Sequence, residues 1–198
     1  MFSLFKRVTP QMGLWLLVLS ACVLFQLTEM QTALRFDRAA IAAGEWYRLL
    51  TANFVHLNAK HLLMNMLGLV IISIYFGRYL TLWQWMMSLL FSSLVLTLAL
   101  YWFNPALHYY VGLSGVLHAL LAVASVQEIK RFPIAGWLLL MLLVAKLLWE
   151  QKYGALSGSE HMIGGRVIVD AHLYGFISGL FICMVPFLAK LKKKVLAS

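Results

Sequence analysis

The stretch GLSGVLH, at residues 112–118, places Ser114 at the start of an apolar segment of membrane length. A second stretch, AHLYGFISG at residues 171–179, opens another such segment with His172. A polar side chain at the end of a membrane helix is energetically expensive and by default indicates a functional site. Because a serine can act as a nucleophile and a histidine as its base, the pair predicts hydrolysis carried out within a bilayer.

The composition is that of a protein that crosses a membrane several times. Of the 198 residues, 63% are hydrophobic and only 12% are charged, which is more apolar surface than a soluble core of this size could hide. The formal net charge is +9. The basic residues gather at the ends of the apolar segments, as membrane topology requires. This distribution favours a lipid bilayer as the partner and argues against nucleic acid.

Six apolar segments can be distinguished along the chain. We expect all of them to be transmembrane helices, because hydrocarbon offers backbone polar groups no other partner. The segments are 12–27, 61–76, 82–103, 112–127, 133–149 and 171–188. The sequence therefore predicts an all-α membrane protein, a six-transmembrane-helix bundle that forms a single membrane domain over residues 1–198. We place its first outer loop at about 28–60 and a basic cytoplasmic tail at about 189–198.

Basic residues at the two ends indicate that both termini are cytoplasmic. Lys6 and Arg7 precede the first apolar segment, and the four lysines of the tail suit anionic lipid headgroups. The run that ends at Cys22 also resembles a lipoprotein processing site, but residues 23–25 continue the apolar run, so we favour a retained first helix. With this orientation the second, fourth and sixth segments all begin at the outer face.

Four polar side chains share the layer just below that face. His61 and Asn65 lie in the second segment, Ser114 in the fourth and His172 in the sixth. We predict that His172 is the general base for Ser114 and later protonates the leaving amine. His61 and Asn65, one helical turn apart, are expected to form an oxyanion hole with the backbone N–H of Ser114. The alternatives are a serine that only packs helices and a buried structural histidine.

Small residues give these two segments a reason to dock. Gly175 and Gly179 share a helix face with His172, and the fourth segment carries a matching stripe of small residues that includes Gly115. Close packing of the two surfaces would bring His172 within hydrogen-bond reach of Ser114.

We identify no acidic third member of the site. Asp170 lies two residues before His172 and does not share its helix face, so we expect it to cap the segment and predict a Ser–His dyad. A metal site built on His61, His172 and Asp170 is a further alternative. No local ligand spacing supports it, and we predict neither a metal nor a cofactor.

The motifs together resemble those of the rhomboid intramembrane serine proteases. Residues 56–65, HLNAKHLLMN, resemble the family's pattern of two histidines and an asparagine. Residues 112–115 resemble its GxSG nucleophile motif, and residues 171–179 its AHxxGxxxG helix. Tyr47 and Arg48 stand where the family usually has Trp-Arg. The resemblance extends from about residue 45 to residue 179, and the motifs occur in the expected order.

The resemblance implies a six-helix fold with Ser114 and His172 in a water-filled depression and with the fifth segment as a candidate lateral gate. It also implies a set of supporting residues. These are Arg48, His56, Gly112, Gly115, His118, Gly175 and Gly179. His118 departs from the pattern, because many rhomboids carry there a tyrosine that packs on the catalytic histidine. We expect His118 to stack at that place or to compete for the proton.

The short chain and the GLSGVLH run look like the rhombosortase branch of the family. That branch is associated with exported bacterial proteins that carry a C-terminal GlyGly-type tail, so the implied location is the bacterial inner membrane with the site toward the periplasm. Glycines form poor helices, at about 1 kcal/mol each relative to alanine. A Gly-rich segment beside a membrane helix can therefore unwind and present its carbonyl group to Ser114.

Two other classes of function remain open. A non-catalytic rhomboid-like protein that binds unstable membrane helices would not need all four polar residues of the outer layer. A transporter or channel would need polar residues through the full depth of the membrane. Lys146 is the one such residue far from the outer layer, and we expect it to extend toward an interface.

Overall fold

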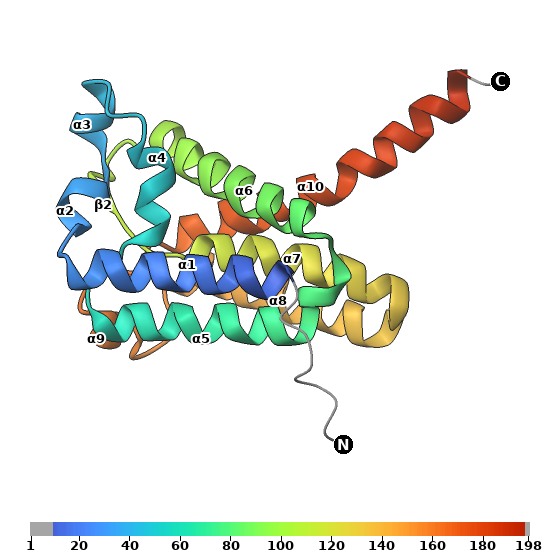
Figure 1. The fold of residues 1–198 in the computed structure, drawn as a ribbon, viewed down its shortest axis with the longest axis horizontal. Helices are drawn as coiled ribbons and strands as arrows, with labels where there is room; N and C mark the ends of the chain where they lie inside the picture. Colours follow the sequence, from blue (N-terminus) through green and yellow to red (C-terminus); the bar gives the residue numbers. More distant parts are fainter. Residues whose placement is uncertain (1–9, 197–198) are drawn as a thin grey trace.

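The computed structural model describes the backbone of residues 10–196 and the side chains of residues 10–184. Within that range, six long helices lie where the six apolar segments were predicted (Figure 1). They are α1 (Pro10–Leu27), α5 (Ala59–Phe76), α6 (Leu82–Phe103), α7 (Ser114–Arg131), α8 (Pro133–Tyr153) and α10 (Val169–Leu196). The basic residues at the extreme N-terminus and in the C-terminal tail, on which the predicted orientation rests, lie outside the described side chains.

The short elements gather mainly at one end of the bundle, where α2, α3, α4, α9 and β2 are labelled in Figure 1. They are α2 (Gln31–Leu34), β1 (Phe36–Asp37), α3 (Arg38–Ala42), α4 (Arg48–Thr51), η1 (Ala52–Phe54), β2 (Tyr109–Tyr110) and α9 (Ser159–Ile163). A further short helix, η2 (Gly77–Tyr79), follows α5. The strands β1 and β2 pair antiparallel, with Phe36 opposite Tyr110. The predicted first outer loop is therefore largely structured.

Four of the described helices are long and apolar enough to cross a membrane: α1, α5 with η2, α6 and α8. The apolar part of α10 within the described side chains is shorter, at Val169–Met184, and α7 ends in the polar run 127–131. Large apolar side chains on the outside of the bundle are strongly exposed, such as Ile134 (88%) and Leu27 (77%). Such surface suits lipid rather than water, so the chain is a multi-pass membrane protein.

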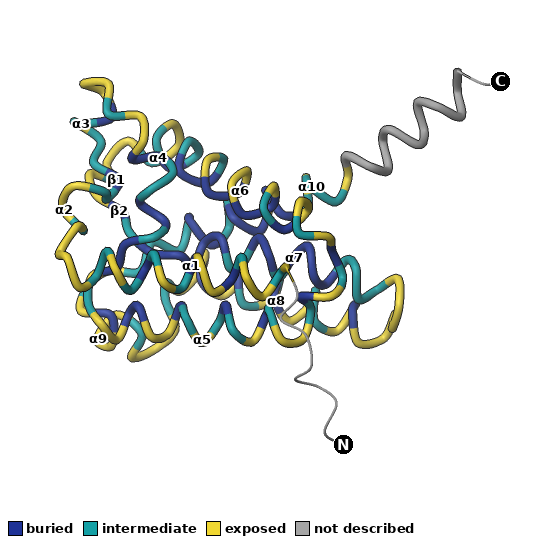
Figure 2. The backbone as a smooth tube through the Cα atoms, in the orientation of Figure 1, coloured by how far each residue is buried: buried dark blue, intermediate teal, exposed yellow. Residues whose placement is uncertain are grey.

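The core is centred on α7, much of which is buried (Figure 2). Its residues Val116, Ala119 and Leu120 are fully buried. The helices α5, α6, α8 and α10 all pack against α7. Helix α1 joins the core through Trp15, whose ring meets that of Trp85 edge to face at 5.3 Å. The helix that carries Ser114 is thus held from several sides.

The predicted close packing of α7 and α10 is present. A Cβ atom at Gly175 would collide with the carbonyl oxygen of Gly115, and one at Gly179 would collide with the carbonyl oxygen of Ala119. On the facing side, a Cβ at Gly115 would lie 2.8 Å from the carbonyl oxygen of Ala171. The two backbones touch, which only glycine permits at these positions.

Candidate active site

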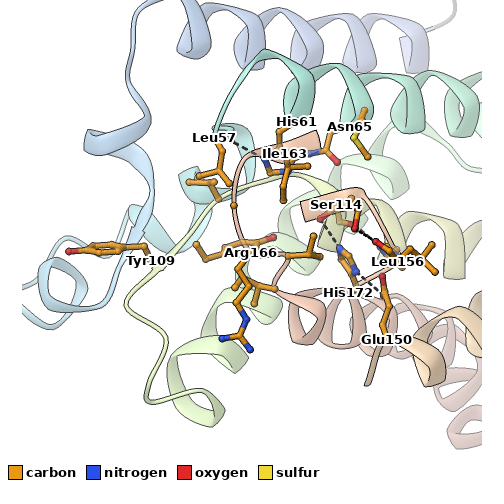
Figure 3. Close-up of a pocket in the computed structure, with 18 of the residues that line it drawn as sticks. Leu57, His61, Asn65, Tyr109, Ser114, Glu150, Leu156, Ile163, Arg166 and His172 are labelled. Carbon is orange, nitrogen blue, oxygen red and sulfur yellow. Dashed lines mark hydrogen bonds and ion pairs between the residues drawn. The ribbon is translucent and has the colours of Figure 1, made fainter. Parts of the chain in front are cut away.

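A cavity of about 500 Å³ lies at the end of the bundle that carries α9, between α5, α7, α8 and α10 (Figure 3). The four polar residues predicted to share one layer, His61, Asn65, Ser114 and His172, all line it. Much of the remaining lining is apolar. It includes Leu57, Met64, Leu156, Ile163 and Ile168. The cavity therefore combines a group of polar side chains with a largely apolar lining, which is usual for a site that binds a mostly apolar ligand.

Ser114 is the first residue of α7 and is presented by a tight turn. Gly112 has φ +119°, and a Cβ there would lie 2.8 Å from the imidazole of His61, so the position requires glycine. The turn is fixed from two sides: the N–H of Gly112 donates to the carbonyl of Ala52 (3.1 Å), and the Tyr110 hydroxyl donates to the carbonyl of Gly112 (2.8 Å). Because Ser114 begins the helix, its own N–H has no acceptor within α7.

His172 lies at the start of α10, directly opposite Ser114. Its Nε2 is 2.9 Å from the Ser114 Oγ, and its side chain is almost entirely buried. The contact follows from the glycine-mediated packing of α7 on α10 described above. The structure thus brings together the two residues that were predicted to act as nucleophile and base.

A buried carboxylate, which the sequence analysis missed, completes this arrangement. Glu150 of α8 is only 3% exposed, and its Oε2 lies 2.9 Å from Nδ1 of His172. An ionised carboxylate only accepts hydrogen bonds, so Nδ1 of His172 carries the proton and the lone pair of Nε2 faces the Ser114 hydroxyl. The expectation of no acidic partner was wrong because the predicted segment ended at residue 149, whereas α8 continues to Tyr153.

Asp170 does not have the role that was predicted for it. Helix α10 begins at Val169, so Asp170 lies within the first turn rather than at the capping position before it. Its Oδ2 accepts a hydrogen bond from the side-chain amide of Asn104 (2.6 Å). Asn104 in turn accepts from the Tyr174 hydroxyl (2.9 Å). Asp170 therefore ties the start of α10 to the end of α6.

Lys146 lies one turn before Glu150 on α8 and points into the site, not toward an interface as predicted. Its Nζ is 2.7 Å from Oε1 of Glu150 and 3.0 Å from Nε2 of His118. The ring of His118 stacks on that of His172, with centroids 4.2 Å apart and planes 15° from parallel. His118 Nδ1 lies 2.7 Å from the carbonyl oxygen of Ser114. The expected stacking of His118 is thus present.

Within the described side chains, the three groups of His118, Glu150 and His172 are near enough to share a metal ion, with ligand atoms within 4.8 Å of one another. Each group already has a hydrogen-bond partner, and the Lys146 ammonium lies beside Glu150 as its counter-charge. A cation would have to displace that ammonium. The set considered from the sequence included Asp170, which instead bonds Asn104.

His61 and Asn65 face the cavity from α5. The Nδ1 of His61 accepts from the backbone N–H of Leu57 (3.4 Å), which leaves the Nε2 proton free to donate. The amide nitrogen of Asn65 is buried and has no acceptor among the described residues. A buried donor without an acceptor is uncommon and requires a reason. His61, Asn65 and the N–H of Ser114 are hydrogen-bond donors at the cavity, which is what an oxyanion hole requires.

Asn58 and His56 support the start of α5. The Asn58 side chain accepts from the N–H of His61 (2.8 Å) and donates to the carbonyl of Ile163 (2.7 Å), which connects α5 to α9. The His56 ring meets that of His61 edge to face at 5.0 Å. Burial, and the nearby His61, lower the pKa of His56 to about 3. His56 is therefore neutral at physiological pH and adds no charge beside His61.

Arg48, predicted as a supporting residue, does not line the cavity. Its guanidinium donates to Glu45 (2.7 Å) and to the carbonyls of Thr32 and Arg35 (3.0 Å each). It holds the first outer loop together. Its connection to the site is indirect, since Arg35 of that loop does line the cavity.

Comparison with known proteins identifies the family of the chain. The Rhomboid domain matches residues 43–188, which is well over half of the chain, so the chain belongs to the rhomboid family. Over 147 residues it is 24% identical to "Putative rhomboid protease YdcA" of Bacillus subtilis (strain 168), a match that covers 73% of this chain and 70% of that protein. The family acts on membrane proteins within the bilayer, and membership indicates intramembrane protease activity.

Proposed function

We propose that the protein is an intramembrane serine endopeptidase in which Ser114 is the nucleophile and His172 the general base. The observation that carries this proposal is the 2.9 Å contact between Ser114 Oγ and His172 Nε2, on the wall of a cavity that also exposes unpartnered donors. All six long helices cross the bacterial inner membrane, both termini are cytoplasmic, and the cavity opens toward the periplasm. This orientation agrees with the positions of the basic residues in the sequence.

The proposed mechanism assigns each step of acyl transfer to a group in the site. His172 Nε2 takes the hydroxyl proton while Ser114 Oγ forms a bond to the scissile carbonyl carbon. The resulting oxyanion accepts hydrogen bonds from His61, Asn65 and the backbone N–H of Ser114. His172 then gives its proton to the amide nitrogen as the C–N bond breaks, which releases the amine and leaves an acyl-enzyme. His172 next deprotonates a water molecule, which attacks the ester carbon. The bond between that carbon and Ser114 Oγ breaks, His172 returns the proton to Oγ, and the carboxylic acid product leaves.

The substrates we propose are exported proteins with a Gly-rich segment beside a C-terminal membrane helix, as in the rhombosortase branch. A stable substrate helix would keep its carbonyl groups in its own hydrogen-bond ladder. A Gly-rich segment unwinds at lower energy and can lie extended in the cavity. The apolar lining, formed by side chains such as Leu57 and Ile163, suits a segment that comes from lipid.

The test is cleavage of a reporter with a GlyGly-type tail by the protein in liposomes, compared with its Ser114→Ala variant. We expect cleavage by the unaltered protein and a loss of at least about 10³-fold in the variant, because the nucleophile is gone. Replacing the reporter's glycines with leucine should sharply reduce cleavage. A folded protein that binds the reporter but leaves it whole would instead support a non-catalytic, helix-binding function.

A further inference from the structure

We propose that Glu150 is a positioning residue that makes the Ser114–His172 pair a triad, and that Lys146 sets the charge and the direction of this carboxylate. The inference rests on the proposed protease function. It concerns two residues on α8 that no motif of the sequence marks, and it assigns both of them to the reaction.

The hydrogen bonds around these residues close into a ring that begins and ends at Ser114. The carbonyl oxygen of Ser114 accepts from Nδ1 of His118, and the other ring nitrogen of His118 accepts from the Lys146 ammonium. Lys146 also donates to Oε1 of Glu150. The second carboxylate oxygen accepts from Nδ1 of His172, whose Nε2 meets the Ser114 hydroxyl.

The donors and acceptors in this ring permit one assignment. Lys146 has only donors, so the nitrogen of His118 that meets it must be an acceptor, and the other nitrogen carries the proton that bonds Ser114. In the same way, Oε2 of Glu150 requires a proton on Nδ1 of His172. The result is that His172 presents a lone pair to the serine hydroxyl, which is the tautomer that a general base needs.

The charges in the ring balance. Glu150 is almost completely buried, and an unpaired carboxylate in such a place is costly. The Lys146 ammonium, 2.7 Å away and about one-third exposed, provides the counter-charge. When His172 accepts the serine proton, Glu150 stabilises the new imidazolium while Lys146 limits that stabilisation. The titratable groups that face His172 are His118 from α7, Lys146 and Glu150 from α8, and His61 from α5.

The decisive variant is Glu150→Gln, which keeps the size of the side chain. Since Lys146 can only donate, it holds the amide oxygen and turns the amide NH₂ toward His172, which forces the wrong tautomer. We expect kcat to fall about 10³-fold with KM little changed. The acidic limb of the kcat–pH profile should move to lower pH, because the imidazolium loses its anion. The matched control is Glu128→Gln, elsewhere on α7. It removes the carboxylate that bonds Tyr79 and should leave activity unchanged.

Lys146→Met is expected to shift the pH profile in the opposite direction. Without the ammonium, the carboxylate acts on the imidazolium alone, so the acidic limb should move to higher pH while kcat falls only about tenfold. Lys146→Arg keeps the charge and should restore most of the activity. In the double variant Lys146→Met, Glu150→Gln, no ammonium holds the amide oxygen, so the amide is free to turn that oxygen to His172. The kcat of the double variant should therefore exceed that of Glu150→Gln alone.

Labelling of Ser114 by a fluorophosphonate separates the two levels of the proposal. No labelling of the folded, unaltered protein would overturn the protease function itself. Two other results would overturn the role of Glu150 and leave the protease function standing. One is that Glu150→Gln is labelled as fast as the unaltered protein. The other is that the losses in kcat of Lys146→Met and Glu150→Gln simply add in the double variant. If Glu150→Gln fails to fold, the direction of the pH shift in Lys146→Met decides.

Discussion

Helix α7 meets α10 and α8 in two different ways. Against α10 it packs backbone to backbone, with Gly175 and Gly179 set on the carbonyls of Gly115 and Ala119. Against the C-terminal half of α8 it is joined by polar side chains, through His118 to Lys146 and onward to Glu150. The first interface is steric, and the second depends on charges and hydrogen bonds.

The difference shows how the site divides its tasks. Backbone contact fixes where Ser114 and His172 stand, because touching backbones cannot move apart or closer without loss of packing. It does not fix the direction in which the imidazole points or which of its nitrogens carries the proton. Those properties come from the α8 side, through the 2.9 Å contact of Glu150 with His172.

This division bears on α8 as a lateral gate, which the family resemblance implied. The N-terminal end of α8 packs Gly136 on the backbone of Ile129, and its middle packs Leu143 and Leu147 in an apolar cluster. Its C-terminal end carries Glu150. An outward swing of that end would remove the carboxylate from His172, so the open state would lack an oriented base. A gate of this kind would have to close again after the substrate has entered, before catalysis could begin.

Breaking the steric interface with Gly175→Leu is expected to have the largest combined effect on stability and activity. Its side chain would push against the carbonyl of Gly115, directly after the nucleophile. Overpacking of this kind typically costs about 1–3 kcal/mol and occasionally more, and displacement of His172 by about 1 Å costs roughly 10²-fold in rate. We expect at least that loss of reporter cleavage, with a lower midpoint of thermal unfolding. Gly13→Leu is the control, since nothing lies within 4 Å of that position, and wild-type cleavage by Gly175→Leu would contradict the steric account.

The steric interface was predictable from the sequence, and the polar one was not. The spacing of His172, Gly175 and Gly179 is a local pattern on one helix, so it predicts a face and its partner. The six helices follow in the same way from apolar runs. Glu150 and Lys146 are single residues near the end of a predicted segment, and segment ends are the least reliable part of such a prediction. Their roles depend on contacts with residues about 30 positions away in α7 and about 20 positions away in α10. A lysine and a glutamate four residues apart were the available signal, because such a pair shares a helix face.

A second prediction concerns α5, which meets the site through neither interface. Asn65→Ala removes a buried donor that has no acceptor among the described residues. If this donor serves only the oxyanion, kcat should fall about 10²- to 10³-fold with unchanged thermal stability. Ser73→Ala, which removes a hydroxyl from the same helix, should leave kcat unchanged. Equal falls in stability and activity would assign Asn65 to packing instead.

The smallest effect is expected at His118, where both kinds of contact meet. Its ring stacks on His172, and its nitrogens bond Lys146 and the carbonyl of Ser114. His118→Phe keeps the stacked ring and removes the hydrogen bonds, whereas His118→Ala removes both. An aromatic pair is worth about 1 kcal/mol, which is roughly a fivefold change in rate.

We therefore expect reporter cleavage by His118→Phe to stay within about threefold of the unaltered protein, and His118→Ala to lose a further factor of about five. Lys146 is partly exposed, so water can replace the lost acceptor in either variant. Stacking then matters because it limits rotation of the imidazole that Glu150 orients from the other side. If phenylalanine proves as damaging as alanine, the hydrogen bonds of His118 are what the site requires, and the polar interface extends across the whole ring rather than ending at Lys146.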